Sequence, residues 1–300
     1  MTLSICIATY NRNKLLEKLL TSLVGQELPG NCTMEIIIVD NNPQAAAREV
    51  VNNFSSSSKI QFLYFVQKEK NISLTRNVAV KNATGDYVLF IDDDEYACDK
   101  WVMHLYNTLI KYDADGVFGI VKSYFDIGTP EWITSCYVFN RPIYPTGTEA
   151  KDMRTGNCMI KTSLLRTVEG PFEPAYGIIG GSDTKLFGLL RLKGAKFINS
   201  SEAETFEFVP SERANLKWVI RRSFRTANVY VKRKIELTDN NKIFIRIKLF
   251  TTGLLFSLIS ILLLIFFLPS KTKRVHWYLK TIANFAKVLA IFGYHWPEYS

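Results

Sequence analysis

Three consecutive carboxylates, Asp92, Asp93 and Asp94, directly follow the apolar segment Tyr87–Ile91. If the alternation of a strand continued through them, Asp92 and Asp94 would point the same way and bring two carboxylates together. Such a pair repels itself unless a cation lies between its members, and an all-oxygen ligand set suits Mg2+ or Mn2+. The alternative is an acidic turn that closes a strand. The rest of the chain must decide between the two interpretations.

The segments around these carboxylates alternate between strand and helix patterns. We expect strands at Leu3–Ala8, Glu35–Val39, Ile60–Val66 and Tyr87–Ile91, and helices at Lys14–Val24, Gln44–Phe54 and Leu74–Asn82. This alternation predicts an α/β fold with a mostly parallel sheet and helices on both faces. Polar clusters follow three of the strands, at residues 9–11, 40–42 and 92–94, so we expect one site along that edge of the sheet.

The pattern changes after Trp101. We expect a strand at Val117–Tyr124, a loop over Phe125–Thr155, a strand at Gly156–Lys161 and a helix at Thr184–Lys193.

The composition excludes several classes of protein. Apolar residues make up 47% of the 300 residues and charged residues 22%, which is typical of neither a disordered chain nor a polytopic membrane protein. The five cysteines form no CxxC pair, so we expect a reducing compartment and neither a disulfide framework nor a zinc site. The chain opens on a strand pattern, and we expect no secretory signal.

Positive charge is concentrated before a long apolar segment. Arg213–Lys248 holds eleven Lys/Arg and two acidic residues, and this charge of +9 equals the net charge of the whole chain. Residues 249–268 carry no charge and are long enough to cross a membrane, and residues 275–296 are typical of an interfacial amphipathic helix. We therefore expect a basic collar that faces anionic lipid, and no nucleic-acid partner. A buried core helix is the alternative for 249–268, and the sequence leaves open whether this segment crosses the membrane or lies in it.

Seven motifs occur in a fixed order. They are SICIATYNR, EIIIVDNNP, NISLTRN, TGDYVLFIDDDEY, TGNCMIK, FEPAYGIIGGSDTKLFGLLRLKGAKF and EFVPSERANLKWVIRRSFR. The ordered set resembles the family 2 inverting glycosyltransferases of the GT-A fold, in particular those that extend bacterial exopolysaccharide, O-antigen or capsule repeat units. The resemblance implies a GT-A domain over residues 1–231, with a nucleotide-binding half at about 1–100 and an acceptor-binding half at about 101–231. The basic collar and the membrane-associated helices would then occupy 232–300.

The resemblance also implies roles for individual residues. Those expected at the nucleotide sugar are Thr9, Tyr10, Asp40, Arg76, Asp92 and Asp93. Asp94 matches the direct ligand of an Mn2+ or Mg2+ cofactor, with Asp92 as its companion. Asp183 matches the general base, although the family usually has Glu-Asp where this chain has Ser182-Asp183. The alternative for Asp183 is an N-cap of the following helix.

Other matches point to the diphosphate or the acceptor. Arg221, Arg222 and Arg225 match an arginine-bearing helix, with the basic collar as the alternative. Trp132 lies where acceptor contacts are expected, as do Tyr137, Tyr144 and Tyr176, and such aromatic residues can equally belong to the core.

The function implied is metal-dependent transfer of a sugar, with inversion, from a nucleotide sugar to a lipid-linked oligosaccharide. A UDP-sugar is the expected donor, and the cytoplasmic face of the inner membrane is the expected location. Two alternatives stay open. A processive polysaccharide synthase would share the catalytic domain but usually has several spanning helices and a QxxRW-type motif. A non-catalytic membrane protein that binds nucleotides or glycans would keep only the scaffold.

Overall fold

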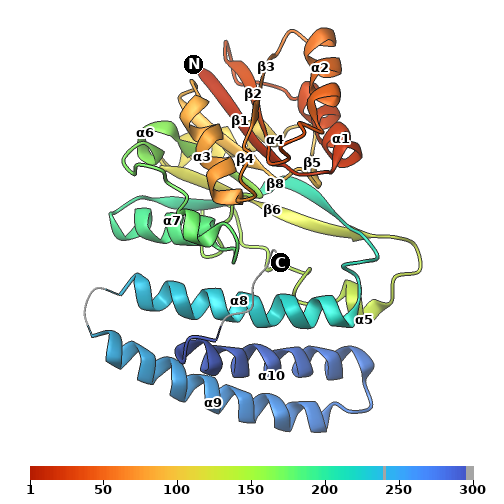
Figure 1. Ribbon diagram of the computed structural model, residues 1–300, viewed down its shortest axis with the longest axis vertical. Helices are drawn as coiled ribbons and strands as arrows, with labels where there is room; N and C mark the ends of the chain where they lie inside the picture. The colour runs from red at the N-terminus through yellow and green to blue at the C-terminus, as the bar shows by residue number, and fades with distance from the viewer. Residues whose placement is uncertain (239–240, 295–300) are drawn as a thin grey trace. The chain divides into compact units, whose positions relative to one another are not determined.

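The computed structural model describes residues 1–238 and 241–294 of the chain (Figure 1). These residues form two compact units, each built from several stretches of the chain. The sheet unit comprises residues 1–122, 142–177 and 182–207, and the helical unit comprises 123–141, 178–181 and the described residues from 208 onward. The expected domain boundary at residue 231 falls inside a helix of the helical unit, and the domain assignment stays a prediction.

Eight strands form one mixed sheet in the order β3-β2-β1-β4-β7-β6-β8-β5. The neighbours from β3 to β4 are parallel, whereas β7 pairs antiparallel with both β4 and β6. The strands are β1 (Thr2–Thr9), β2 (Thr33–Asp40), β3 (Gln61–Val66), β4 (Tyr87–Ile91), β5 (Glu95–Ala97), β6 (Gly116–Phe125), β7 (Asn157–Lys161) and β8 (Phe197–Val209). The parallel arrangement therefore holds for the first four strands, whose carboxyl ends carry the candidate site.

Helices cover both faces of the sheet because successive strand residues point in opposite directions. Ile5 and Ile7 of β1 pack in a core with α1 (Asn13–Val24), α2 (Arg48–Ser57) and α4 (Trp101–Lys111). Cys6 points to a second core, formed with α3 (Ile72–Asn82), α6 (Thr162–Leu165) and α7 (Ser182–Leu192). A short 3-10 helix, η1 (Pro174–Tyr176), precedes α7. The alternation of strands and helices predicted for residues 1–91 is confirmed.

After residue 91, fewer of the helices and strands were predicted from the sequence. α4, β5 and β8 were not predicted, and the expected loop at 125–155 contains α5 (Glu131–Thr134). β8 was missed because Ser200–Glu204, in its middle, has a single apolar residue and breaks the hydrophobic pattern.

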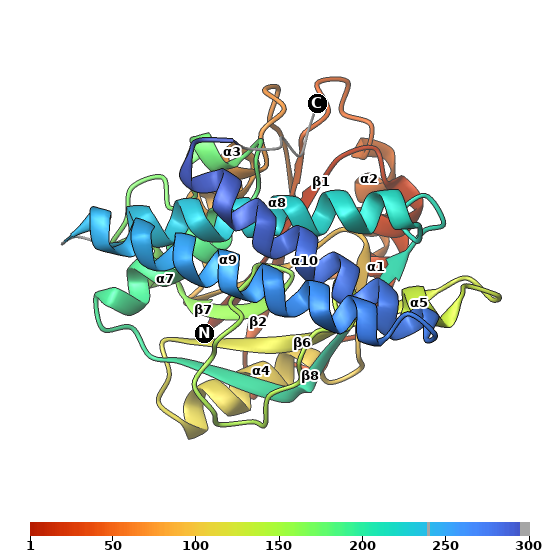
Figure 2. The ribbon, with the colours of Figure 1, turned by 90° about the horizontal axis from the view of Figure 1, so that it is seen from below.

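Three long helices lie side by side in the helical unit (Figure 1 and Figure 2). They are α8 (Leu216–Glu236), α9 (Lys242–Phe266) and α10 (Lys271–Ile291), and α10 packs against both of the others. Within the described residues, α9 is the one helix long and apolar enough to cross a membrane. It covers most of the expected span at 249–268. The expected helix at 275–296 corresponds to α10, and its last two residues, 295 and 296, lie outside the described residues.

Candidate active site

The three aspartates lie in a turn and not on a continuing strand. β4 ends at Ile91, and the N–H of Glu95 donates to the carbonyl oxygen of Asp92 at 3.1 Å. The strand alternation that was expected to bring Asp92 and Asp94 together therefore does not apply. Instead, Arg12 Nη1 donates to Asp93 Oδ1 at 2.7 Å and to Asp94 Oδ2 at 2.9 Å. Asp92 has a different cationic partner.

Arg12 and Asp93 form the centre of a buried polar cluster at the ends of β1 and β4. The hydroxyl of Thr9 donates to Asp93 Oδ2 at 2.8 Å, and the backbone N–H of Tyr10 lies 3.4 Å from the same oxygen. Burial raises the pKa of Asp93 to about 6; Asp94 adds to this shift, whereas Arg12 and Thr9 oppose it. Burial opposes the charge of Arg12, but Asp93 and Asp94 outweigh it and raise the pKa of the guanidinium.

Arg12 was not among the predicted site residues. It ends the quoted motif SICIATYNR, and its cationic side chain lies three residues after Thr9. These signals could have suggested a partner for the acidic cluster. Its partners lie 81 and 82 positions later in the chain, and the sequence alone does not predict that pairing.

Asp40 ends β2 and is fully buried. Its Oδ1 accepts from the N–H of Asn42 at 2.8 Å, and its Oδ2 accepts from the N–H of Ala47 at 2.9 Å and from the hydroxyl of Tyr64 at 2.8 Å. In this conformation the carboxylate holds the segment that follows β2. A nucleotide could reach it only if residues 41–47 moved, so base recognition by Asp40 stays a prediction.

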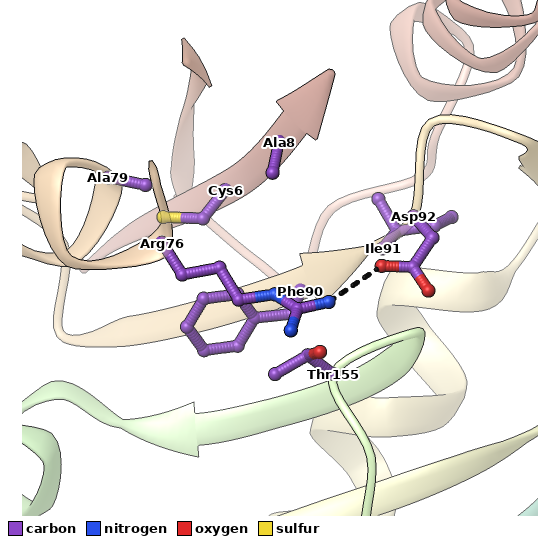
Figure 3. A pocket seen from close by; sticks show the side chains of 8 residues that line it. All are labelled: Cys6, Ala8, Arg76, Ala79, Phe90, Ile91, Asp92 and Thr155. Atoms are coloured by element: carbon purple, nitrogen blue, oxygen red, sulfur yellow. Dashed lines mark hydrogen bonds and ion pairs between the residues drawn. The ribbon is translucent and has the colours of Figure 1, made fainter. Parts of the chain in front are cut away.

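A pocket lies at the carboxyl ends of β1 and β4 (Figure 3). Arg76 and Asp92 face each other across it, and Arg76 Nη2 donates to Asp92 Oδ1 at 3.2 Å. The Thr155 hydroxyl is buried and has no hydrogen-bond partner among the residues that the structure describes. The lining consists of Cys6, Ala8, Arg76, Ala79, Phe90, Ile91, Asp92 and Thr155. The pocket thus combines a cation, a carboxylate and a hydroxyl with an apolar floor, which suits a charged polar ligand.

Asp183 is connected to this pocket through Thr155. It is the second residue of α7, so it lies inside the first turn and not at an N-cap position. Its Oδ2 lies 3.4 Å from the backbone nitrogen of Thr155, which donates, and its Oδ1 accepts from the N–H of Thr184 at 2.7 Å. Thr155 therefore lines the pocket together with Asp92 and Arg76 and also binds the carboxylate of Asp183.

Several predicted residues lie elsewhere in the molecule. Arg221, Arg222 and Arg225 are on α8, and Trp132 is on α5, all in the helical unit. Trp132 packs against that unit's core, where Lys271 Nζ lies 5.5 Å from the centre of its ring. Their roles at a diphosphate or acceptor stay predictions.

The three expected tyrosines differ in position. Tyr176 is fully buried in the sheet unit, so it is a core residue, and the expectation that it stacks on an acceptor is wrong for this structure. Tyr137 donates to the Ser223 hydroxyl at 3.1 Å inside the helical unit. Tyr144 is half-buried in the segment before β7.

The oxygen donors fit a hard cation, with Asp92 as the more accessible ligand. Its side chain is 42% exposed, whereas that of Asp94 is 9% exposed and bound by Arg12. Among the residues that the structure describes, no group of three or more His, Cys, Asp or Glu side chains is arranged to hold a metal. An ion here would therefore take most of its ligands from water and from a bound diphosphate, as Mg2+ commonly does.

Sequence comparison assigns the family. The profile of "Glycosyl transferase family 2" matches residues 4–168, more than half of the chain. The chain belongs to glycosyl transferase family 2. Among known proteins, it is similar to the succinoglycan biosynthesis protein ExoM of Rhizobium meliloti (strain 1021), with 30% identity over 232 residues. That match covers 76% of this chain and 74% of ExoM. The expected resemblance is confirmed, and the chain is a glycosyltransferase.

Two solved structures show the same fold. TarS 1–349 of S. aureus in complex with UDP aligns with a TM-score of 0.56 and 17% identity, over 96% of this chain and 90% of that one. The mannosyltransferase PcManGT of Pyrobaculum calidifontis, in complex with GDP-Man and Mn2+, aligns with a TM-score of 0.63 and 17% identity, over 96% and 86%. The expected α/β class of the GT-A type is confirmed.

Proposed function

We propose that this glycosyltransferase moves a sugar from a nucleotide-sugar donor to a hydroxyl group of a lipid-linked glycan, with inversion at the anomeric carbon. The observation that supports this is the arrangement around the pocket: Arg76 and Asp92 line it, and Thr155 connects it to the carboxylate of Asp183. A diphosphate needs a cation, and an attacking hydroxyl needs a base. Both kinds of side chain are present in the sheet unit.

In this proposal Arg76 binds diphosphate oxygens, because a permanently charged guanidinium with several donors matches their geometry. Asp183 accepts the proton of the acceptor hydroxyl as its oxygen attacks the anomeric carbon opposite the diphosphate. Thr155 holds one oxygen of Asp183 through its backbone N–H and leaves the other near the start of α7. Thr9, Tyr10 and Asp93 would lie beside the nucleotide part of the donor.

Asp92 and Asp94 would hold a divalent cation. Such an ion, when bound, neutralises the charge that develops on the departing diphosphate. The Mn2+ in the mannosyltransferase complex supports this proposal by similarity of fold. In the present conformation Asp94 is bound to Arg12, whereas Asp92 is more exposed. We therefore expect the ion to bind Asp92 more readily than Asp94.

The comparisons support the choice of donor and location. TarS binds UDP and the mannosyltransferase binds GDP-Man, so nucleotide sugars are the donor class, and we propose a UDP-sugar first. The name of ExoM places that relative in succinoglycan biosynthesis, which supports an acceptor that belongs to a surface polysaccharide. The exposed apolar helix α9 supports attachment to the inner membrane, with the sheet unit on the cytoplasmic side.

The decisive experiment measures slow hydrolysis of UDP-, GDP- and dTDP-sugars by the detergent-solubilised protein with Mn2+ or Mg2+. We expect one donor to be cleaved, EDTA to abolish cleavage, and Asp92→Asn to reduce it at least tenfold. With a lipid-linked acceptor, Asp183→Asn should abolish transfer, and NMR of the product should show an inverted anomeric centre. Glu17→Gln, at an exposed position of α1, is the matched control.

Other outcomes would favour the alternatives. Binding of nucleotides without hydrolysis or transfer, even with acceptor present, would indicate a binding protein. Long polymer made from one donor would indicate a processive synthase. Full transfer by Asp183→Asn would reject the proposed base.

A further inference from the structure

α9 contacts α10 through a narrow strip of small and polar residues. A Cβ on Gly253 would lie 2.9 Å from Val288 Cγ2, and Asn284 Nδ2 donates to Ser260 Oγ at 3.3 Å. The buried residues of α9 are Leu249, Gly253, Ser257 and Ser260. This strip extends over about three turns of helix, which is a little under half of α9, and over this stretch the two helices lie close together.

Beyond its first two turns, which carry the exposed cations Lys242, Arg246 and Lys248, the rest of the surface of α9 is largely exposed and apolar. Leu258 and Leu262, for example, are 62% and 67% exposed. The exposed apolar residues in the second half of the helix are Leu254, Leu255, Phe256, Leu258, Ile259, Ile261, Leu262, Ile265 and Phe266. A continuous apolar surface of this kind needs a partner of low polarity.

α10 carries cations beside this apolar surface. Lys280 Nζ lies 4.1 Å from the centre of the Tyr137 ring, and Lys287 Nζ donates to Asn284 Oδ1 at 2.9 Å. Neither lysine forms a salt bridge with an acidic residue in the described part of the chain. Burial lowers the pKa of both, which shows that their surroundings disfavour a charge.

α8 lies along the other side of α10 and is strongly basic. Asn228 Nδ2 donates to the carbonyl oxygen of Ala286 at 3.0 Å, and Val231 packs with Ala290. The lysines and arginines of α8 are Lys217, Arg221, Arg222, Arg225, Lys232, Arg233 and Lys234. α10, with its two half-buried lysines, thus packs against both the apolar α9 and the basic α8, and α8 also contacts α9, where Val231 and Leu249 share one core (Figure 1).

We propose that α9 lies in the plane of one leaflet of an anionic lipid membrane and does not cross it; this inference rests on the membrane attachment proposed above. A crossing α9 would take α10 and α8 with it, because α10 packs against α9 and α8 packs along α10. Lys280 and Lys287 would then lie in hydrocarbon, together with the arginines of α8, which is strongly unfavourable.

An in-plane position gives both the apolar and the basic helices a suitable lipid environment. A helix is about 10 Å wide and one leaflet has about 15 Å of hydrocarbon, so α9 fits inside a single leaflet. α10 then lies at the level of the headgroups, where lysines meet anionic lipid. The exposed aromatic residues Tyr278 and Phe285 of α10 and Phe292 at its C-cap follow a seven-residue spacing, and aromatic side chains are favoured at that level.

Depth measurements distinguish the two orientations. Leu254, Leu258 and Ile265 are all exposed and lie on one face of α9. Nitroxides on Leu254→Cys, Leu258→Cys and Ile265→Cys, each in a Cys32→Ser/Cys98→Ser background of the full chain, are placed in vesicles that contain phosphatidylglycerol. Their relative accessibility to oxygen and to a water-soluble nickel complex reports depth. Asn52→Cys, exposed on α2, is the aqueous control.

We expect the three labels on α9 to report one common depth within the hydrocarbon. A crossing helix would instead give depths that change by about 1.5 Å per residue along its axis, and this gradient would overturn the inference. If the protein fails to co-sediment with the vesicles, the proposed membrane attachment fails as well. Immobilised labels in a dimer that does not bind vesicles would show that a second copy covers α9, which also overturns the inference.

Discussion

Arg12 donates a hydrogen bond to Asp93 at 2.7 Å and joins the loop after β1 to the turn after β4. The same nitrogen also reaches Asp94, so one guanidinium compensates two adjacent carboxylates. Both carboxylates are buried. The acidic turn is therefore held together by a cation of the protein itself.

Replacing Arg12 by alanine would leave two buried carboxylates without this partner. We expect Arg12→Ala to lower the free energy of unfolding by about 1–3 kcal/mol, because the two buried carboxylates lose a charged donor whose own side chain is 34% exposed. Thermal denaturation in detergent measures the change. Arg12→Lys keeps the charge and should recover a large part of the loss. Equal losses for both variants would mean that packing, and not charge, is responsible.

The raised pKa of Asp93 predicts a dependence of stability on pH. In the unfolded chain an aspartate titrates near pH 4, whereas in the folded protein the pKa is about 6. Between these values the folded state binds more protons, so this group's contribution to stability is full below about pH 4 and is lost as the pH rises through about 6. The contribution is at most about 3 kcal/mol for a shift of about two pKa units.

Asp93→Asn should remove this dependence. We expect its melting temperature to vary less with pH between 4 and 6 than that of the wild-type protein. Glu17→Gln, which changes an exposed carboxylate, should keep the wild-type slope. Parallel slopes for Asp93→Asn and the wild type would reject a raised pKa at this residue.

Thr155 offers a test in which stability and activity change in opposite directions. Its buried hydroxyl has no hydrogen-bond partner within residues 1–238 and 241–294, so Thr155→Val should leave the fold as stable as before or more stable by about 1 kcal/mol. If that hydroxyl contacts the bound substrate, donor hydrolysis should decrease about tenfold. The backbone N–H that supports Asp183 is retained. Unchanged kcat/KM would show that the hydroxyl does not contact the bound substrate.

The close approach of α9 and α10 at Gly253 is sensitive to side-chain size. We expect Gly253→Leu to destabilise the helical unit by about 1–3 kcal/mol, because its Cβ alone would lie 2.9 Å from Val288 Cγ2. Melting of the detergent-solubilised variant measures this effect. Gly253→Ala combined with Val288→Ala should cost less than Gly253→Ala alone, since the second change makes room for the new methyl group. An additive result would show that the two residues do not compete for space.

The first four strands were predictable because each is a short, nearly continuous apolar segment that ends in polar residues. Their buried cores and parallel order place Thr9, Asp40 and Asp92 at one edge of the sheet, as expected. The partners within that edge were not predictable. Arg12 meets Asp93 across 81 positions of sequence, and the turn after Ile91 changes which aspartates face each other.

Local patterns were weaker in the second half of the chain. The small residues of α9 that contact α10 have no strong hydrophobic signal, so the sequence indicated an apolar segment without its packing partner. Tyr176 shows the same limit, because an aromatic residue in a loop-like segment can be an exposed contact or a core residue. Burial decides between them, and it depends on contacts with distant elements.

The division of the chain into two units affects how the enzyme can be shortened. Ile133 and Phe139 precede β7 in the sequence, yet their core is completed by Val219 of α8 and Leu279 of α10. A chain cut after β8 would therefore keep an apolar segment whose covering helices are gone. We expect such a fragment to precipitate, and a soluble catalytic fragment to require replacement of residues 123–141 by a short polar linker as well. α8 and α10 are in this sense needed to cover the core of the remaining chain, and removing them exposes it.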